Sequence, residues 1–86
     1  MHLGYNQNVV YKGETYHVQT EDGGRTNPVI TTHLFRGGVI LASRRAGYDD
    51  ILKSDRLDDA VKGLMVEQHR GLIKDLLEGT LDASLG

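Results

Sequence analysis

Four histidines are the side chains best suited to chemistry, because an imidazole can bind a metal or transfer a proton near neutral pH. They are His2, His17, His33 and His69. None has a second histidine at the spacing of an H-x3-H or H-E-x-x-H zinc motif. His17 and His33 could approach each other across neighbouring strands, with Glu21 supplying an oxygen ligand. A polar-face histidine on each strand is the simpler interpretation, so we expect no metal site.

No pattern for nucleophilic catalysis or cofactor binding accompanies the histidines. The chain has no cysteine, which excludes disulfides and thiolate zinc sites. Ser43, Thr20 and His17 cannot be assembled into a catalytic triad from their order, and no glycine-rich loop resembles a phosphate-binding site. The aspartates between positions 49 and 59 lack EF-hand spacing, and helix capping or solvation explains them better. We therefore predict neither an enzyme nor a cofactor.

Basic residues near the end of a predicted strand offer an anion-binding alternative. With one tyrosine they form the set Arg36, Arg44, Arg45 and Tyr48. Arginine can bind phosphate through two hydrogen bonds, and a tyrosine ring can stack on a nucleic-acid base. The formal net charge of -2 and the isoelectric point near 6.0 weigh against nucleic acid. Pairing of these arginines with helix carboxylates is the competing interpretation.

Two β-hairpins are predicted for the first half of the chain. Residues 9–11 and 15–20 alternate in polarity on either side of a glycine turn. Residues 29–35 and 39–44 are rich in β-branched and apolar side chains and flank Gly37-Gly38, a pair that suits a two-residue turn. With that turn, Leu34 should face Leu41 and His33 should face Ala42.

One long helix is predicted over about residues 55–78. Ser54 and Asp55 suit its start, and Gly79 suits its end. A broad stripe at helical spacing should face the sheet; it consists of Leu57, Ala60, Val61, Leu64, Met65, Gln68, Leu72 and Leu76.

A second apolar face on the same helix is the best functional clue in the sequence. Val66, Ile73 and Leu77 lie away from the main stripe, with His69 on their flank. Either another part of the chain, such as residues 48–54, covers this face, or its residues are singly exposed, or a second copy or partner protein docks there. Two helix glycines, Gly63 and Gly71, mark either close approach of another backbone, a kink or chance.

These elements predict a single α+β domain over residues 1–86. An antiparallel sheet of about four strands, over about residues 8–45, should carry the long amphipathic helix on one face. The ends, residues 1–6 and 80–86, should fray. Since no stretch approaches the ~20 apolar residues of a membrane span and no signal peptide precedes the strands, we expect no membrane contact and a cytoplasmic location.

Three segments resemble a family of short bacterial proteins without an established activity. They are residues 16–22 (YHVQTED), residues 40–45 (ILASRR) with Tyr48, and residues 64–69 (LMVEQH). The similarity extends over roughly residues 9–81. It implies a bacterial, cytoplasmic, self-contained unit and no mechanism. We therefore expect a small non-enzymatic interaction module that forms a homodimer or binds another protein, with anion or nucleic-acid binding as the alternative.

Overall fold

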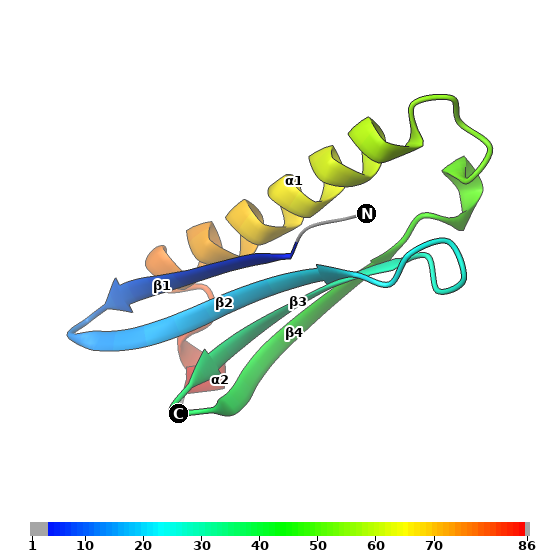
Figure 1. Ribbon diagram of the computed structural model, residues 1–86. Helices are drawn as coiled ribbons and strands as arrows, with labels where there is room; N and C mark the ends of the chain where they lie inside the picture. The colour runs from blue at the N-terminus through cyan, green and yellow to red at the C-terminus, as the bar shows by residue number, and fades with distance from the viewer. Residues whose placement is uncertain (1–3, 86) are drawn as a thin grey trace.

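The computed structural model describes residues 4–85, which form one antiparallel sheet and a long helix (Figure 1). The sheet strands are β1 (Tyr5–Tyr11), β2 (Glu14–Asp22), β3 (Val29–Arg36) and β4 (Val39–Gly47). A 3-10 turn η1 (Asp49–Ile51), the helix α1 (Leu57–Leu77) and the short helix α2 (Asp82–Leu85) follow. The predicted α+β architecture is confirmed. The sheet begins at residue 5 rather than 8, and the helix lies within the expected limits.

The strands are ordered β1-β2-β3-β4, so each pairs with its neighbour along the chain. Lys12 and Gly13 close the first hairpin with φ angles of 50° and 79°, and Gly37 and Gly38 close the second with 58° and 80°. Two successive positive φ angles give the turn twist that matches a twisted antiparallel pair. Glycine supplies three of these four angles without steric cost.

The second hairpin contains a β-bulge that the sequence reasoning did not foresee. Phe35 pairs with Ile40 as expected, but Leu34 pairs with Ala42 and His33 with Ser43. The predicted pairs of Leu34 with Leu41 and of His33 with Ala42 are therefore wrong. One extra residue in β4 breaks the alternation, and both Leu41 and Ala42 consequently pack against the core.

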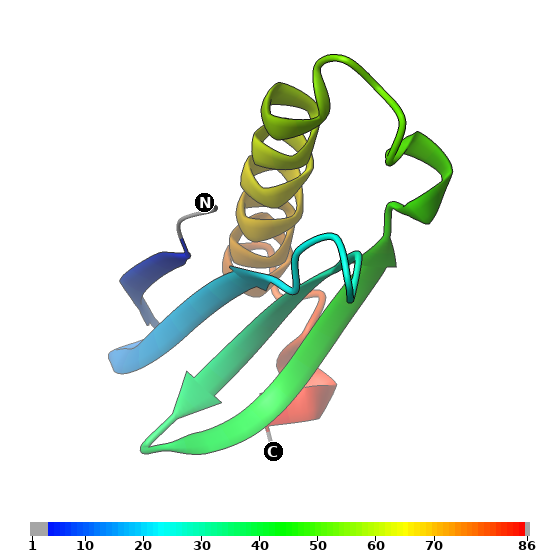
Figure 2. The same ribbon diagram turned by 45° about the vertical axis from the view of Figure 1, so that its right-hand side comes forward.

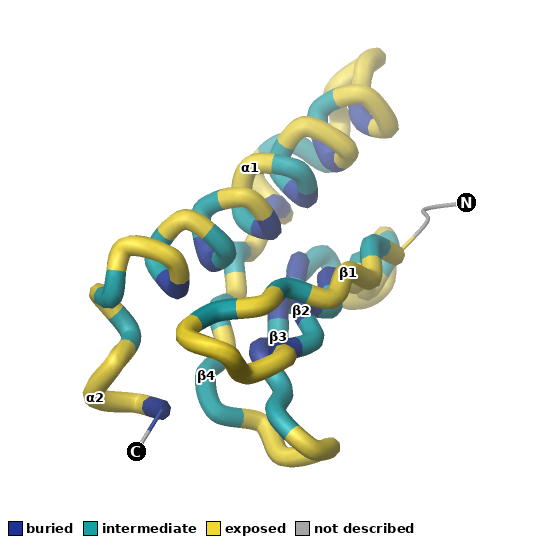
Figure 3. Tube along the Cα trace, turned by 90° about the vertical axis from the view of Figure 1, so that its left-hand side faces the viewer, coloured by how far each residue is buried: buried dark blue, intermediate teal, exposed yellow. Residues whose placement is uncertain are grey.

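Helix α1 lies across one face of the sheet, as Figure 2 shows. Figure 3 shows its buried positions turned toward the strands and its exposed positions turned away. The buried residues of α1 follow a spacing of three or four; they are Leu57, Val61, Met65, His69, Leu72 and Leu76. This arrangement confirms most of the predicted stripe and adds His69 to it, whereas Ala60, Leu64 and Gln68 are only partly buried.

The core divides into two apolar clusters. One consists of Tyr16, Val18, Leu34, Leu72, Leu76 and Leu85. The other consists of Ile30, Tyr48, Leu57, Val61 and Met65. The buried polar residues Thr20, Thr32 and His69 belong to neither cluster. Their polarity has to be satisfied by hydrogen bonds within the protein.

The ends of α1 agree only in part with expectation. The helix begins after Arg56 without a side-chain cap, and the Ser54 hydroxyl instead accepts a hydrogen bond from the Arg56 backbone at 3.2 Å. Ser54 and Asp55 therefore do not cap the helix as predicted. Gly79 follows the helix with a φ angle of 82°, and its N–H bonds the Leu76 carbonyl at 3.2 Å. This left-handed residue confirms the predicted stop.

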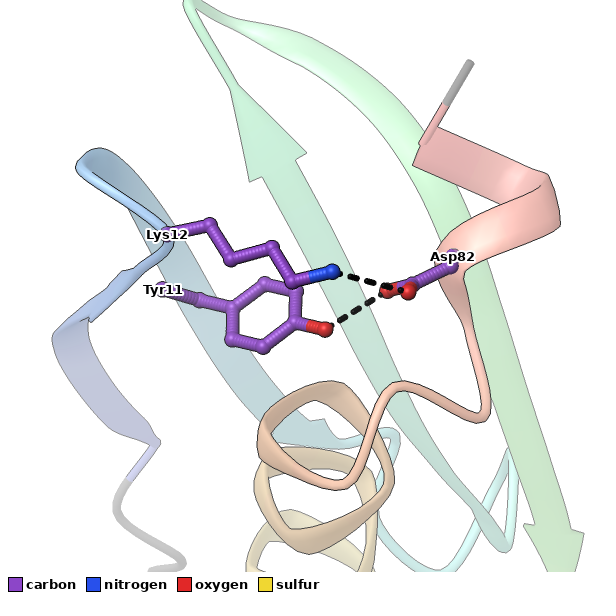
Figure 4. A network of polar contacts seen from close by, with 3 residues as sticks. All are labelled: Tyr11, Lys12 and Asp82. Carbon is purple, nitrogen blue, oxygen red and sulfur yellow. Dashed lines mark hydrogen bonds and ion pairs between the residues drawn. The ribbon is translucent and has the colours of Figure 1, made fainter.

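Parts of both predicted flexible ends belong to regular elements. Residues 5 and 6 belong to β1, and α2 buries Leu85 against the first cluster. The Tyr11 hydroxyl donates to Asp82 at 2.8 Å, and the Lys12 ammonium lies 3.3 Å from the same carboxylate (Figure 4). The Tyr11 hydrogen bond, followed by Lys12, lowers the pKa of Asp82. Residues 1–3 and 86 lie outside the described part of the chain.

Among residues 4–85, no helix has the length and apolar character needed to cross a membrane.

Candidate docking surface

A groove runs between the edge strand β1 and helix α1. Its first part has a volume of about 280 Å³, and its second part about 620 Å³. Gln7 and Arg70 line both parts, so the two are continuous. The remaining lining residues are Tyr5, Asn6, Val66, His69, Ile73, Lys74, Leu77 and Glu78. We call this surface the β1–α1 groove.

The second apolar helix face predicted from sequence lines this groove. Val66 and Ile73 are partly buried, and Ile73 packs on the edge of the first core cluster. Leu77 remains 50% exposed. The structure therefore brings all three residues to one surface beside β1. Residues 48–54 are not among those that line the groove, so the segment suggested as a cover does not provide one there.

His69 lies in the sheet-facing stripe, and it also lines the first part of the groove beside Val66. Its exposed fraction is 6%, and its Nε2 and Nδ1 atoms lie 3.1 Å from Gln7 Oε1 and 2.8 Å from Thr20 Oγ1. Because a carbonyl oxygen only accepts, these partners assign the proton to Nε2. Nδ1 then accepts from the Thr20 hydroxyl. Burial, and next the charge of His17, lowers the pKa of His69, which favours this neutral form.

The hydrogen-bond chain continues from His69 into the sheet. Thr20 Oγ1 lies 2.7 Å from Thr32 Oγ1, and Gln68 Nε2 lies 3.1 Å from Thr32 Oγ1. Gln68 Nε2 also donates to the carbonyls of Ile30 and Arg44 at 3.1 and 3.2 Å. Since Thr20 donates to His69, Thr32 donates to Thr20, and Gln68 donates to Thr32. The hydrogen bonds thus run in one direction from Gln68 on α1 through Thr32 on β3 and Thr20 on β2. They return to His69 on α1 and end at Gln7 on β1, beside the groove.

The residues of the anion-binding alternative do not form one surface. Arg36 donates to the Leu85 carbonyl at 2.9 Å, and Arg44 forms an ion pair with Asp75. Arg45 is exposed, whereas Tyr48 is only 1% exposed. Arg45 is thus the exposed arginine of this set, whereas Arg36 and Arg44 are partly buried. The pairing of Arg44 with a helix carboxylate agrees with the competing interpretation.

Tyr48 is buried and hydrogen-bonded within the fold. Its hydroxyl donates to Asp22 Oδ1 at 2.5 Å, and the same oxygen accepts from the Gly24 N–H at 3.0 Å. Burial, with the Asp22 hydrogen bond second, raises the pKa of Tyr48 to about 12. The side chain consequently ties the end of β4 to the end of β2 and is not available for stacking on a base.

The sheet face opposite α1 carries a row of rings. Phe35 lies between His17 and His33, with ring centroids 6.1 and 5.7 Å away. His33 Nδ1 lies 2.6 Å from Ser43 Oγ, and the His17 nitrogens lie 2.9 and 3.3 Å from the side-chain oxygens of Asn8 and Asn6. No three acidic or histidine side chains gather as a metal site within residues 4–85.

The β1 wall of the groove was not predicted from the sequence. Tyr5 and Gln7 precede the predicted start of the sheet. A period-2 pattern would have found them, because Tyr5, Gln7, Val9 and Tyr11 occupy alternate positions. The helical spacing also predicts burial of His69, since it lies four residues after Met65 and three before Leu72.

No family, curated protein or solved structure matches the chain.

Proposed function

We propose that this protein is a non-enzymatic interaction module that associates with a second copy of itself through the β1–α1 groove. The single observation that carries the proposal is the exposure of Leu77, 50%, within a groove that Val66 and Ile73 also line. Removal of apolar surface from water contributes about 25 cal/mol per Å² of favourable free energy, which offsets part of the entropic cost of association. An apolar wall beside an edge strand is thus a favourable place for a partner.

The small size of the chain also supports self-association. A domain of 86 residues buries only roughly 60% to 70% of its unfolded surface, which leaves little stability in reserve. A second copy that covers the groove would add to the free energy of unfolding by mass action. The proposal includes a cytoplasmic location and a bacterial source, and it assigns no reaction to the protein.

Sedimentation equilibrium over a micromolar concentration series tests the proposal. Leu77→Asp places a charge in the groove, and we expect it to weaken dimerisation at least about tenfold. Ile40→Asp is the matched control, because Ile40 is 51% exposed on β4. We expect it to leave the dissociation constant unchanged. A parent protein that stays monomeric throughout the series would contradict the proposal, as would equal effects of the two substitutions.

A further inference from the structure

We infer that the second copy docks by adding its own β1 antiparallel to β1, with the two-fold axis at Asn8, so that two four-stranded sheets become one. This inference rests on the proposed self-association and specifies its geometry. Its basis is the free edge of β1. Within residues 4–85, β1 pairs with β2 on one side and with no strand on the other.

The two edges of the sheet differ in their protection against pairing. Edge strands are commonly protected by charges, proline or a bulge. Strand β1 has the sequence YNQNVVY, without a charged residue or proline, and it pairs with β2 over seven residues in unbroken register. Strand β4 carries Arg44 and Arg45 and contains the bulge. The β1 edge is therefore the one that can accept another strand.

The backbone of β1 fixes which residues would pair. A two-residue hairpin closes on a hydrogen-bonded pair, here Tyr11 with Glu14. Hydrogen bonding to β2 then alternates along the strand, and the backbone groups of Asn6, Asn8 and Val10 point to the free edge. These three residues are symmetric about Asn8. A two-fold axis there pairs Asn8 with itself and Asn6 with Val10, which gives about six new hydrogen bonds.

Side chains and charges are compatible with this pairing. On the helix side, Tyr5 of one copy would lie opposite Tyr11 of the other, and an aromatic pair of this kind favours association. The two-fold axis also makes the grooves of the two copies run in opposite directions. Because Arg70 lies beside Gln7 and Glu78 lies at the far end of the groove, Arg70 of each copy would approach Glu78 of the other. The neutral strands introduce no like-charge contact at the centre.

Cysteine cross-linking tests the register, since the parent chain has no cysteine. Paired Cα atoms in a hydrogen-bonded antiparallel pair lie ~5.5 Å apart, within reach of a disulfide. We expect Asn8→Cys to form a disulfide-linked dimer under mild oxidation. Asn6→Cys and Val10→Cys should cross-link when mixed and not singly. Arg45→Cys, on the opposite edge, is the control that should stay unlinked.

A proline substitution tests the edge hydrogen bonds. Asn8→Pro removes the N–H that points to the free edge and leaves the ladder to β2 intact. Because the axis doubles the loss, we expect its dimer dissociation constant to exceed that of the control Asn8→Ala at least about tenfold. A dimer that persists without the Asn8→Cys cross-link, or with equal constants for these two variants, would overturn the edge pairing alone. A monomeric parent protein would overturn the proposed function as well.

Discussion

At the level of single residues, the chain of hydrogen bonds from Gln68 to Gln7 is the feature that distinguishes this core. Four hydrogen bonds join five side chains, and in each bond the donor lies on the Gln68 side. Each of the two threonine hydroxyls accepts a hydrogen bond from the preceding member and donates one to the next. Removal of one member therefore leaves two buried groups without a partner, which costs more than the loss of an isolated hydrogen bond.

Thr20→Val tests this coupling. Valine has a similar shape, but it removes the donor to His69 and the acceptor for Thr32, so we expect a loss of about 2 to 4 kcal/mol in the free energy of unfolding. Urea denaturation measures it. Thr15→Val is the matched control, because Thr15 lies exposed on the same strand. A change below about 0.5 kcal/mol in the free energy of unfolding for both variants would mean that these hydrogen bonds do not stabilise the fold.

The lowered pKa of His69 predicts a pH dependence with a definite sign. Folded His69 stays neutral where the unfolded residue, with an ordinary pKa of 6.5, already binds a proton. The stabilisation is complete above pH 6.5 and is lost as the pH falls toward the folded pKa, by at most about 1.4 kcal/mol per pH unit. Unfolding free energies between about pH 5 and 7.5, at fixed protein concentration, measure the slope. His69→Gln should abolish the slope, and His33→Gln should keep it.

At the level of elements, glycine has opposite roles at the end and in the middle of α1. Gly79 has a φ angle of 82°, and a Cβ there would lie 3.3 Å from both Tyr11 Oη and Asp82 Oδ2. Gly63 has open space where a Cβ would be, and Gly71 has the Arg44 guanidinium at 3.7 Å. Neither helix glycine therefore has another backbone within 4 Å of its would-be Cβ, which was one of the alternatives raised by the sequence.

A pair of alanine substitutions measures this contrast. We expect Gly79→Ala to lower the free energy of unfolding by about 1 to 2 kcal/mol, because alanine is strained at positive φ. Gly63→Ala should raise it by up to about 1 kcal/mol, because alanine is the better helix former. Thermal unfolding of the two variants beside the parent gives both signs. If both variants were destabilised, a Cβ at position 63 would have to meet another group. That result would contradict the open space found there.

The elements themselves were predictable because their signals are local. The Gly37-Gly38 turn and the spacing from Leu57 to Leu76 depend on neighbours a few residues apart. The bulge in β4 was not predictable, because it depends on packing Leu41 and Ala42 together against the core. For the candidate site, the sequence predicted Val66, Ile73 and Leu77, which line the groove. The opposite wall, β1, depends on the tertiary packing of a strand against the helix and was not predicted.

At the level of the whole molecule, α2 connects the tips of the two hairpins. Asp82 binds Tyr11 and Lys12 at the first turn, and the Leu85 carbonyl accepts from Arg36 beside the second turn. This segment therefore connects the β1–β2 turn with the β3–β4 turn, which lie at the same end of the antiparallel sheet. Its stabilising effect should extend beyond its own few residues.

Leu85→Ala tests the role of this segment. The side chain is 9% exposed and packs in the first core cluster, so we expect a loss of about 2 kcal/mol in the free energy of unfolding. Ser84→Ala, at an exposed position of the same turn, should change it by less than about 0.5 kcal/mol. Urea denaturation followed by circular dichroism compares them. Equal midpoints would mean that α2 does not stabilise the sheet.

The difference between the edge strands β1 and β4 limits the size of the proposed assembly. If two copies join through β1 as proposed, the pairing would use the free backbone groups of both β1 strands, and the outer strands of the joined sheet would be the two copies of β4. The bulge and the two arginines of β4 oppose further strand addition. The proposed assembly would therefore stop at the dimer, and a higher protein concentration would increase the dimer fraction without forming a fibre.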